Sequence, residues 1–363
     1  MDIPFPPNYG GIIDVFFKLK AFHQLGVKIY LHVFGVSENG IEKLKEFSEE
    51  VYFYPIKKNP IDLLSSTPFS IKSRKGKLLL ENLRKIDAPI FFESFRTMDV
   101  LNYDELKSYK KYLRLHNIEH NYFNGLAESE TNFFKQKIYQ QEAEKYKKYE
   151  KIISQMNEVF TLSNFEQNYI HKKYNKGILV PVFNGNSTFP ELEKFGKYIL
   201  YHGDLRTADN CKVVEFLIDV FKESEYQFVI ASGVKEDWVR SKIGAFQNIQ
   251  FVKLKDFNHL LDLFKDAHIN IAWSFQESGT KLKVVNALFN SRFSLINQYV
   301  IDEEKIAELC YKAETAQEIL YQTEVLMQTP FLMTEEYKTK LNLCLNDLEN
   351  AKIILDTIFM QED

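Results

Sequence analysis

Cysteine is scarce in this sequence, and positive charge is not in surplus. The 363 residues include 3 cysteines, Cys211, Cys310 and Cys344, which are far apart and odd in number. This pattern excludes a disulfide-stabilised scaffold and a closely spaced zinc site, and it fits a reducing compartment. The formal net charge of −4 argues against a nucleic-acid-binding protein, which needs a positive surplus to contact phosphates.

Long hydrophobic runs are also missing. No stretch reaches the roughly 20 apolar residues that a membrane-spanning helix requires. The start, MDIPFPPNYGG, lacks the basic segment and the continuous apolar segment of a signal peptide. We therefore expect a cytoplasmic protein, and peripheral contact with the inner face of the membrane through basic and aromatic segments stays open.

The composition is otherwise that of a globular protein, with 45% hydrophobic and 26% charged residues. The length favours two domains, because single hydrophobic cores stop growing well before 363 residues. Aromatic residues make up 15% of the chain, with 31 Phe and 20 Tyr. We expect most of these rings in the core and some exposed for stacking on sugars or bases.

Short β-rich apolar runs alternate with amphipathic helical stretches, which predicts parallel sheets built from βαβ units. Strands are expected at residues 27–34, 51–55, 88–93, 112–116, 158–162, 177–181, 198–201, 227–232, 249–253, 269–273 and 293–297. Helices are expected at residues 12–26, 128–155, 210–222, 235–244, 257–265, 281–289 and 334–359.

The stretch 182–195 has the composition of an interdomain linker. It predicts an N-terminal domain at residues 1–182 and a C-terminal domain at 183–340, with a C-terminal helix at 341–363 that packs back toward the first domain. The loop-like residues 4–11 come almost at once, before a buried strand of ordinary length could form. We expect either a minimal first strand or a chain that starts late.

Gly10 and Gly11 directly precede an expected helix. Glycines let the backbone approach a ligand closely, and a helix N-terminus offers free N–H groups to a phosphate. A plain turn is the alternative, since the preceding Pro-Pro-Asn-Tyr is good turn chemistry.

The polar stretch from Arg114 to His120 lies at the end of an expected strand and includes His116 and Asn117. In doubly wound folds ligands bind at the carboxyl ends of strands. The alternative is an ordinary helix start capped by Asn117.

Gly203 and Arg206 follow the first expected strand of the second domain and precede a helix. The planar guanidinium of Arg206 suits a diphosphate because it can donate two hydrogen bonds at once. An exposed turn with a surface arginine explains this stretch equally well.

The stretch from Glu277 to Leu288 is the most specific signal. It passes through Gly279 and Thr280 into a helix with Lys281 and Lys283 in its first turn. Lysines at a helix N-terminus meet the positive end of the helix dipole, so they predict an anionic ligand there. A solvated pair of surface lysines is the alternative.

These stretches, in this order, resemble family 4 glycosyltransferases of the GT-B fold, particularly the subgroup common in Bacteroidetes polysaccharide loci. The residues that carry the resemblance are PPNYGGIIDVFFKLKAFHQLGVKIYLHVF, RLHNIEHNYF, LYHGDLRTADN and GTKLKVVNALFNSRFSLIN, so it covers nearly the whole chain. The resemblance implies an α/β fold of two Rossmann-like doubly wound parallel-sheet domains that face a cleft, the first on the acceptor side and the second for the donor. It also implies a retaining reaction that needs neither a metal nor a separate cofactor.

The resemblance also implies roles for single residues. Gly10 and Gly11 would face the donor diphosphate and the transferred sugar, and His116, with Asn117 beside it, would lie at the reaction centre. The cations Arg206 and Lys281, with Lys283 as the alternative to Lys281, would neutralise the leaving diphosphate, which the loops of Gly203, Gly279 and Thr280 would line.

Glu277 resembles the first acid of the family's E-x7-E motif, which contacts the donor sugar. The second acid, which holds the ribose, is replaced by Asn286, nine positions later rather than eight. An amide can still hydrogen-bond a ribose, but without a charge.

We therefore expect a glycosyltransferase of the hexosyl type. It would move a sugar from a UDP- or GDP-sugar donor to a glycan or lipid-linked acceptor in bacterial cell-surface polysaccharide synthesis. Two alternatives remain: an enzyme of the nucleotide-sugar epimerase type on the same fold, which would need a carboxylate pair for proton abstraction, and a catalytically silent sugar-binding or partner protein.

Overall fold

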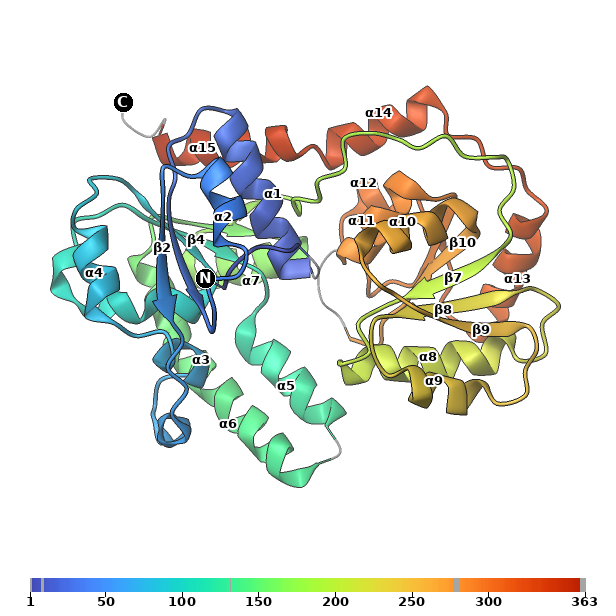
Figure 1. Cartoon of the computed structure of the whole chain (residues 1–363), viewed down its shortest axis with the longest axis horizontal. Helices are drawn as coiled ribbons and strands as arrows, with labels where there is room; N and C mark the ends of the chain where they lie inside the picture. The colour runs from blue at the N-terminus through green and yellow to red at the C-terminus, as the bar shows by residue number, and fades with distance from the viewer. Residues whose placement is uncertain (1, 8–9, 131, 277–280, 360–363) are drawn as a thin grey trace. The chain divides into compact units, whose positions relative to one another are not determined.

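The computed structural model describes residues 2–7, 10–130, 132–276 and 281–359 (Figure 1). The chain divides into two compact units, unit 1 with Met1–Phe183 and Asp347–Asp363, and unit 2 with Asn184–Asn346. The boundaries expected from the sequence were at residues 182 and 340.

Unit 1 is built on two groups of parallel strands. Strand β1 (Tyr30–Gly35) pairs with β2 (Glu50–Pro55). The second group has the order β3 (Ile90–Glu93), β4 (Lys111–Leu115), β5 (Glu158–Thr161) and β6 (Ile178–Leu179). Every residue of β4 is buried, as expected for a parallel strand covered on both faces.

The start of the chain adds a single parallel bridge, between Asp2 and Phe34 of β1. The Asp2 carboxylate is held by Arg74 Nη2 at 2.6 Å and by Arg96 Nη1 at 3.0 Å. This bridge is the minimal first strand that the sequence offered as one of two explanations. Two arginines fix it, rather than a long ladder of backbone hydrogen bonds.

The helices of unit 1 cover these strands. The α-helices are α1 (Gly10–Gln24), α2 (Ile41–Leu44), α3 (Phe69–Lys72), α4 (Lys77–Leu83), α5 (Glu119–Ser129), α6 (Phe133–Tyr149), α7 (Asn164–Tyr174) and α15 (Asp347–Phe359). Short 3-10 helices lie at η1 (Lys45–Phe47), η2 (Pro60–Leu64), η3 (Phe95–Asn102), η4 (Asp104–Leu106) and η5 (Glu150–Gln155).

The single helix expected at residues 128–155 was wrong. The structure has α5, a break, α6 and then η5 over this region. The Asn132 side chain accepts a hydrogen bond from the Lys135 N–H at 3.1 Å, so Asn132 caps α6 and starts a new helix. The helix expected at residues 334–359 is likewise divided, into α14 (Glu335–Cys344) and α15.

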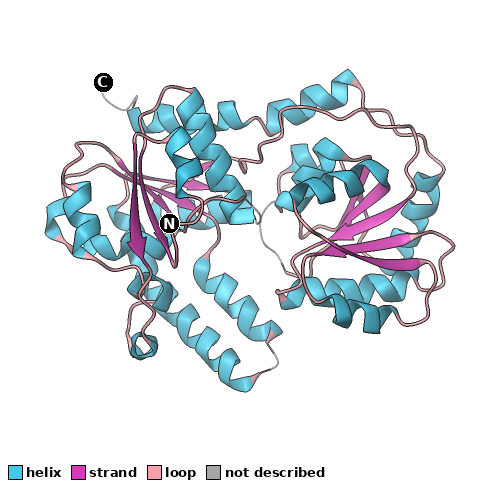
Figure 2. Cartoon of the chain, viewed as in Figure 1, coloured by secondary structure: helices cyan, strands magenta, loops and turns pink. Residues whose placement is uncertain are grey.

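Unit 2 contains one parallel sheet with the order β12-β11-β10-β7-β8-β9. Its strands are β7 (Tyr198–His202), β8 (Phe228–Ser232), β9 (Ile249–Lys253), β10 (Ala267–Ala272), β11 (Phe293–Ile296) and β12 (Tyr311–Lys312). Its remaining helices are α8 (Ala208–Phe221), α9 (Glu236–Ile243), α10 (Phe257–Asp266), α11 (Leu282–Asn290), α12 (Glu304–Ala307) and α13 (Ala316–Met327). Helices lie on both faces of this sheet, α8 and α9 on one and α10 and α11 on the other (Figure 2).

Strand β12 was not predicted. Its two residues, Tyr311 and Lys312, are both exposed, so no apolar run marks them. They form a strand because they pair with Leu295 and Ile296 of β11.

The chain passes between the two units twice, after Phe183 and after Asn346. On each side of this boundary, one hydrogen bond joins the two segments. In unit 1, Asn350 Nδ2 donates to the carbonyl oxygen of Pro181 at 3.3 Å. In unit 2, Asn184 Nδ2 donates to the carbonyl oxygen of Leu345 at 3.1 Å.

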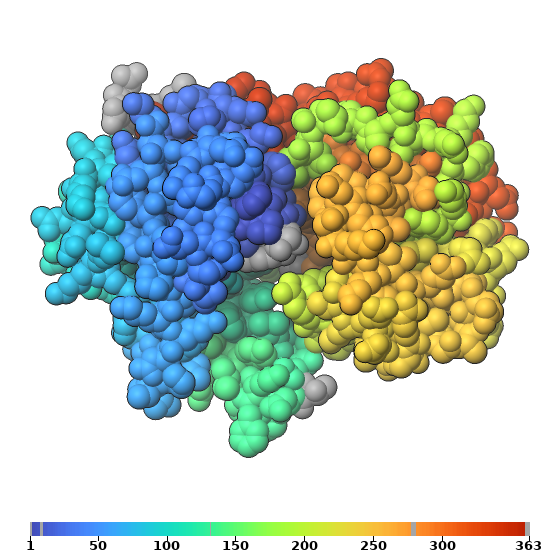
Figure 3. Space-filling model, in the orientation of Figure 1, coloured from blue at the N-terminus to red at the C-terminus, as the bar shows by residue number. Residues whose placement is uncertain are grey.

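Some large apolar side chains of unit 1 remain at the surface. The η2 segment and the ends of α5 and α6 project from the body of this unit (Figure 3). They carry the exposed side chains of Ile61, Leu64, Phe133 and Phe134. Among the described residues, none of the helices combines the length and the apolar character needed to cross a bilayer.

Helix α15 packs against α1 and completes the core of unit 1. Ile354 is fully buried in a cluster with Ala21 and Phe22 of α1, whereas its neighbour Ile353 is 41% exposed. We expect Ile354→Ala to destabilise unit 1 by about 2–5 kcal/mol, because it leaves a cavity. Ile353→Ala, the matched control, should cost less than about 1 kcal/mol.

Hydrogen exchange would measure this difference in each unit. In Ile354→Ala the amides of β4 and β5 should exchange faster, while those of β7 and β8 in unit 2 keep their rates. Equal protection in the two variants would contradict the assignment of α15 to the core of unit 1.

Candidate functional site

Helix α1 carries two charged side chains inside an otherwise apolar surface. Asp14 and Lys18 are each 1% exposed, and Lys18 Nζ lies 3.1 Å from Asp14 Oδ2. One helical turn separates them, so both side chains point to the same side of the helix. Buried charges are costly unless they are paired, so partners from other elements are needed here.

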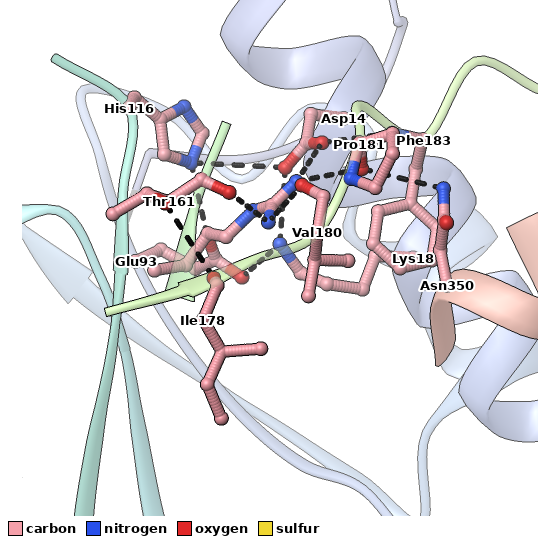
Figure 4. A network of polar contacts seen from close by, with 11 residues as sticks. Asp14, Lys18, Glu93, His116, Thr161, Ile178, Val180, Pro181, Phe183 and Asn350 are labelled. Carbon is pink, nitrogen blue, oxygen red and sulfur yellow. Dashed lines mark hydrogen bonds and ion pairs between the residues drawn. The ribbon is translucent and has the colours of Figure 1, made fainter. Parts of the chain in front are cut away.

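Those partners come from the carboxyl ends of two neighbouring strands (Figure 4). Glu93 is the last residue of β3, and its Oε1 lies 2.7 Å from Lys18 Nζ. Arg114 of β4 is fully buried, and its Nη2 lies 3.1 Å from Asp14 Oδ1. The result is a continuous network of two carboxylates and two cations, in the order Arg114, Asp14, Lys18 and Glu93.

Arg114 also fixes the backbone where the chain leaves the sheet. Its guanidinium donates to the carbonyl oxygens of Val180 at 2.7 Å, Pro181 at 3.0 Å and Thr161 at 3.3 Å. The N–H of Phe183 donates to Asp14 Oδ1 at 2.9 Å. The charge network therefore anchors the end of unit 1 as well as α1.

Both carboxylates are held in the ionised form. Burial would raise the pKa of Asp14, but the charges of Arg114 and Lys18 together hold it far below its usual range. Burial opposes ionisation of Glu93 as well, and Lys18 and His116 lower its pKa below the ordinary value. The network thus carries two negative charges that neighbouring cations compensate.

His116 lies at the edge of this network and is 15% exposed. Its Nε2 is 3.1 Å from Glu93 Oε2 and 3.8 Å from Asp14 Oδ2. The other ring nitrogen, Nδ1, faces α1: a Cβ added to Gly11 would lie 3.5 Å from it. The structure thus brings together Gly11 and His116, which are far apart in the sequence, and Glu93 orients the ring between them.

Asp14, Glu93 and His116 have the composition of a metal site, with potential ligand atoms within 4.8 Å of one another. The carboxylate oxygens, however, already have partners. Those of Asp14 face Arg114, Phe183 N–H and Lys18, and those of Glu93 face Lys18 and His116. A cation would have to displace the Lys18 ammonium, so the donor set fits an ion-pair network better than a metal.

Two more polar residues follow His116. Asn117 is half-buried. Glu119, in the first turn of α5, is 5% exposed, and burial raises the pKa of its carboxyl, against the opposing charges of Arg96 and His116. Near His116 the chain thus keeps a third carboxyl group, whose pKa lies above its ordinary value.

In unit 2 the loop after β7 is closely packed around Gly203. A Cβ at this position would lie 3.0 Å from Tyr201 Oη and 3.3 Å from Asn210 Cγ. Tyr201 Oη in turn donates to Asn210 Oδ1 at 3.1 Å. Glycine is needed here for space.

Arg206 is 69% exposed and is bound by Asp204 within its own loop. Its Nε lies 2.9 Å from both carboxylate oxygens, and its Nη2 lies 2.6 Å from Oδ2. Burial works against ionisation of Asp204, but the hydrogen bonds from Arg206 lower its pKa. A diphosphate at Arg206 would therefore compete with Asp204.

Lys283 of α11 lies beneath this loop. Its Nζ donates to the carbonyl oxygen of Trp273 at 3.0 Å and lies 5.0 Å from the centre of the Tyr201 ring. Burial, and then the charge of Lys281, lower the pKa of Lys283 to about 7. Burial and Lys283 also lower the pKa of His202 to about 3, so this histidine is neutral.

The remaining residues of unit 2 that the sequence indicated as donor-binding differ in their surroundings. Lys281 caps α11 and its N–H donates to the Val300 carbonyl oxygen at 2.9 Å. Asn286 is 4% exposed, and its Oδ1 accepts from Asn186 Nδ2 at 3.2 Å. Glu277, Gly279 and Thr280 lie outside the described residues.

Sequence reasoning missed Asp14, Lys18, Glu93 and Glu119. A signal was present for the first two: an aspartate and a lysine four residues apart interrupt the otherwise apolar stretch from Gly10 to Leu19. For Glu93 the signal was its place as the last residue of an apolar strand. Glu119 was part of the polar stretch after β4, but nothing in that stretch indicated its burial.

Comparisons with known proteins add the following. No family model matches the chain. A Klebsiella pneumoniae protein described as an uncharacterized 44.6 kDa protein in the cps region is 25% identical over 321 residues, which cover 80% of each chain.

Several solved structures are similar over nearly the whole chain. Sucrose-phosphate synthase from Thermosynechococcus elongatus matches with a TM-score of 0.69 and 12% identity, over 98% of this chain and 95% of that one. A variant of S. aureus TarM in complex with fondaparinux, alpha-GlcNAc-glycerol and UDP gives 0.64 and 13%, over 99% and 98%. Anabaena HepE in complex with UDP gives 0.62 and 8%, over 95% of each. The α/β fold expected from the sequence is confirmed: its architecture is that of the GT-B fold.

The buried network predicts a large cost for removing one of its charges. Asp14→Asn should lower the free energy of unfolding by about 3–5 kcal/mol at pH 7, because it leaves the buried Arg114 without a counter-charge and Lys18 with Glu93 alone. Glu46→Gln, which breaks the exposed pair with Lys43, is the control and should cost less than about 1 kcal/mol.

The pH dependence follows from the lowered pKa values. The ordinary values of Asp14 and Glu93 are 3.8 and 4.5, and the folded values are lower. The contribution of the network is thus complete above about pH 4.5 and is lost as the pH falls through the folded values. Urea titrations between pH 7 and pH 3 should show a smaller acid loss for Asp14→Asn than for the unchanged protein, and an equal loss would contradict the assignment.

Proposed function

We propose that this protein is a glycosyltransferase of the hexosyl type that takes its sugar from a UDP- or GDP-sugar. The reaction would retain the anomeric configuration and would need no metal. The observation that carries the proposal is the packing of Gly11 at the start of α1 against His116, whose ring is oriented by Glu93. The proposal includes membership of glycosyltransferase family 4 and of its subgroup common in Bacteroidetes polysaccharide loci.

Unit 1 would contribute the groups at the sugar. With Nε2 of His116 donating to Glu93 Oε2, Nδ1 is left as an acceptor for a sugar hydroxyl on the Gly11 side. The N-terminus of α1 begins at Gly10 and offers its N–H groups to negative charge. Gly10 has open space where a Cβ would be, so a ligand can approach its backbone.

Unit 2 would hold the nucleotide end of the donor. Lys281, Lys283 and Arg206 supply positive charge around the loop of Gly203. The pKa of Lys283, about 7, leaves this amine only partly charged at neutral pH, and a bound diphosphate would favour its ammonium form. Asn286, already bound to Asn186, would need to exchange that bond for one to the ribose.

In the proposed reaction the acceptor hydroxyl oxygen forms the new bond to the anomeric carbon. The bond from that carbon to the diphosphate oxygen breaks, and its electron pair leaves with the diphosphate. The hydroxyl proton passes to the departing phosphate. Fixed cations and helix N-termini stabilise the developing negative charge, so no strong protein base is required.

The charge network argues against the epimerase alternative. Proton abstraction would need a carboxylate that can accept a proton near neutral pH. Asp14 and Glu93 are buried, ion-paired and held ionised at low pKa, which suits them to orient His116 rather than to act as bases. Of the three carboxyl groups near His116, Glu119 alone has a raised pKa, whereas this alternative needs a pair.

The relatives support an acceptor in polysaccharide synthesis. One relative is named for a cps region, which points to capsule polysaccharide, and the structural neighbours named above include complexes with UDP. We propose a glycan or lipid-linked acceptor and a cytoplasmic location at the inner face of the membrane. The exposed apolar side chains of η2 and α6 are suited to peripheral contact there.

His116→Ala should abolish sugar transfer while donor affinity changes little, because the ring contacts the sugar and not the diphosphate. His171→Ala, on an exposed position of α7, is the control. Nucleotide release that depends on acceptor measures turnover, and calorimetry with the nucleoside diphosphate measures binding. Near-normal turnover in His116→Ala would remove this residue from the reaction centre.

Lys281→Ala and Arg206→Ala should each weaken binding of UDP or GDP by roughly 10- to 150-fold, which corresponds to the about 1.5–3 kcal/mol of a charge-assisted hydrogen bond. Lys255→Ala removes an exposed lysine of the same unit and should leave the affinity unchanged. Unaltered affinity in the first two variants would count against their phosphate role, and no nucleotide binding at all would favour the silent-partner alternative.

A further inference from the structure

A polar cavity in unit 1 lies outside the residues of the candidate site. Its volume is about 500 Å³, within the range of about 300–1,000 Å³ that is typical of small-molecule sites. It is lined by Lys57, Lys72, Lys75, Gly76, Lys77, Asp99, Asn102 and Tyr103. Four lysines around one carboxyl group give this cavity a net positive charge.

Among the described residues, at most one of the four lysines takes part in an ion pair. Lys75 lies 3.9 Å from Asp62, at the limit of an ion pair. For Lys57, Lys72 and Lys77, the part of the chain that the structure describes provides no carboxylate within ion-pairing distance. Four ammonium groups that face one cavity repel one another, so an anionic ligand would stabilise the arrangement.

The cavity is also formed at a place where α/β proteins bind ligands. Lys57 follows the carboxyl end of β2 by two residues, and its N–H donates to the Ser73 carbonyl oxygen at 2.9 Å. Asp99 and Asn102 belong to η3, the segment that follows Glu93 at the carboxyl end of β3. Lys72 ends α3 and Lys77 begins α4 (Figure 1). Ligands of open α/β sheets bind beyond the carboxyl ends of the strands.

The neutral groups of the cavity indicate more than a simple anion. Asn102 Nδ2 donates to the Asp99 carbonyl oxygen at 3.0 Å and to Asp99 Oδ1 at 3.3 Å, which turns the amide oxygen of Asn102 and the second carboxyl oxygen of Asp99 to sugar hydroxyls as acceptors. Tyr103 adds an aromatic ring of the kind that packs against apolar faces. The volume also exceeds what one phosphate or sulfate ion would fill.

We propose that this cavity binds an acidic saccharide, with the lysines contacting carboxylate or phosphate groups carried by the sugar. This inference rests on the proposed function, under which the cavity is a subsite for a negatively charged glycan acceptor. The site would make the protein selective for anionic acceptors. Neither His116 nor the donor-binding groups of unit 2 would provide that selectivity.

The test compares two probes of equal length on the full chain by calorimetry: hexagalacturonate, which is anionic, and maltohexaose, which is neutral. We expect hexagalacturonate to bind and maltohexaose not to bind. The double variant Lys72→Gln/Lys77→Gln should weaken hexagalacturonate binding by about tenfold or more, since two charge-assisted contacts are lost. Asp99→Asn should strengthen it several-fold, because it removes the negative charge of the cavity and retains the shape.

The control is Lys20→Gln/Lys151→Gln, which removes two exposed lysines elsewhere in unit 1 and should leave binding unchanged. Equal losses in the two double variants, or no binding of hexagalacturonate, would overturn the proposal. So would inorganic phosphate that binds as tightly as hexagalacturonate. A vesicle arm with phosphatidylglycerol tests a lipid source: lysine-dependent pelleting without hexagalacturonate binding would also overturn it.

UDP binding is measured on the same preparations. Loss of UDP binding with retained hexagalacturonate binding would reject the transferase and leave the saccharide site standing. The reverse result would reject the saccharide site alone.

Discussion

The structure of unit 1 depends on one buried charge arrangement, in which Asp14 and Glu93 face Arg114 and Lys18. Removing any one of these groups would leave an uncompensated charge in the interior, which is why all four must be present together. Their attraction fixes the first helix against strands β3 and β4. The same contacts set the position of His116, which has no other carboxylate partner among the described residues than Glu93 and Asp14.

The two units differ in how their buried cations are compensated. In unit 1 the cations near His116 are neutralised within the protein, which leaves the exposed edge of that ring for uncharged contacts. In unit 2, Lys283 donates to a backbone carbonyl rather than to a carboxylate, and burial, followed by the charge of Lys281, lowers its pKa. This difference agrees with the proposed roles, in which unit 1 binds the sugar and unit 2 binds the diphosphate.

Much of the fold could be predicted because buried parallel strands are continuous apolar runs. The runs around β4, β8 and β9 mark their strands within about a residue or two at each end. The break between α5 and α6 depends on one capping side chain, Asn132, which a helical pattern does not reveal. Local motifs singled out Gly11 and His116 in the sequence, and the roles assigned to these two residues stay predictions. The contribution of Glu93 depends on the pairing of β3 with β4, a contact between distant residues that has no local signature.

The asparagines at the chain crossings have a mechanical consequence. Because Asn350 binds the Pro181 carbonyl on one side and Asn184 binds the Leu345 carbonyl on the other, the two connections are clamped together at both ends. The two side chains therefore keep the outgoing and the returning segment side by side, and separating these segments would break at least one of the two hydrogen bonds.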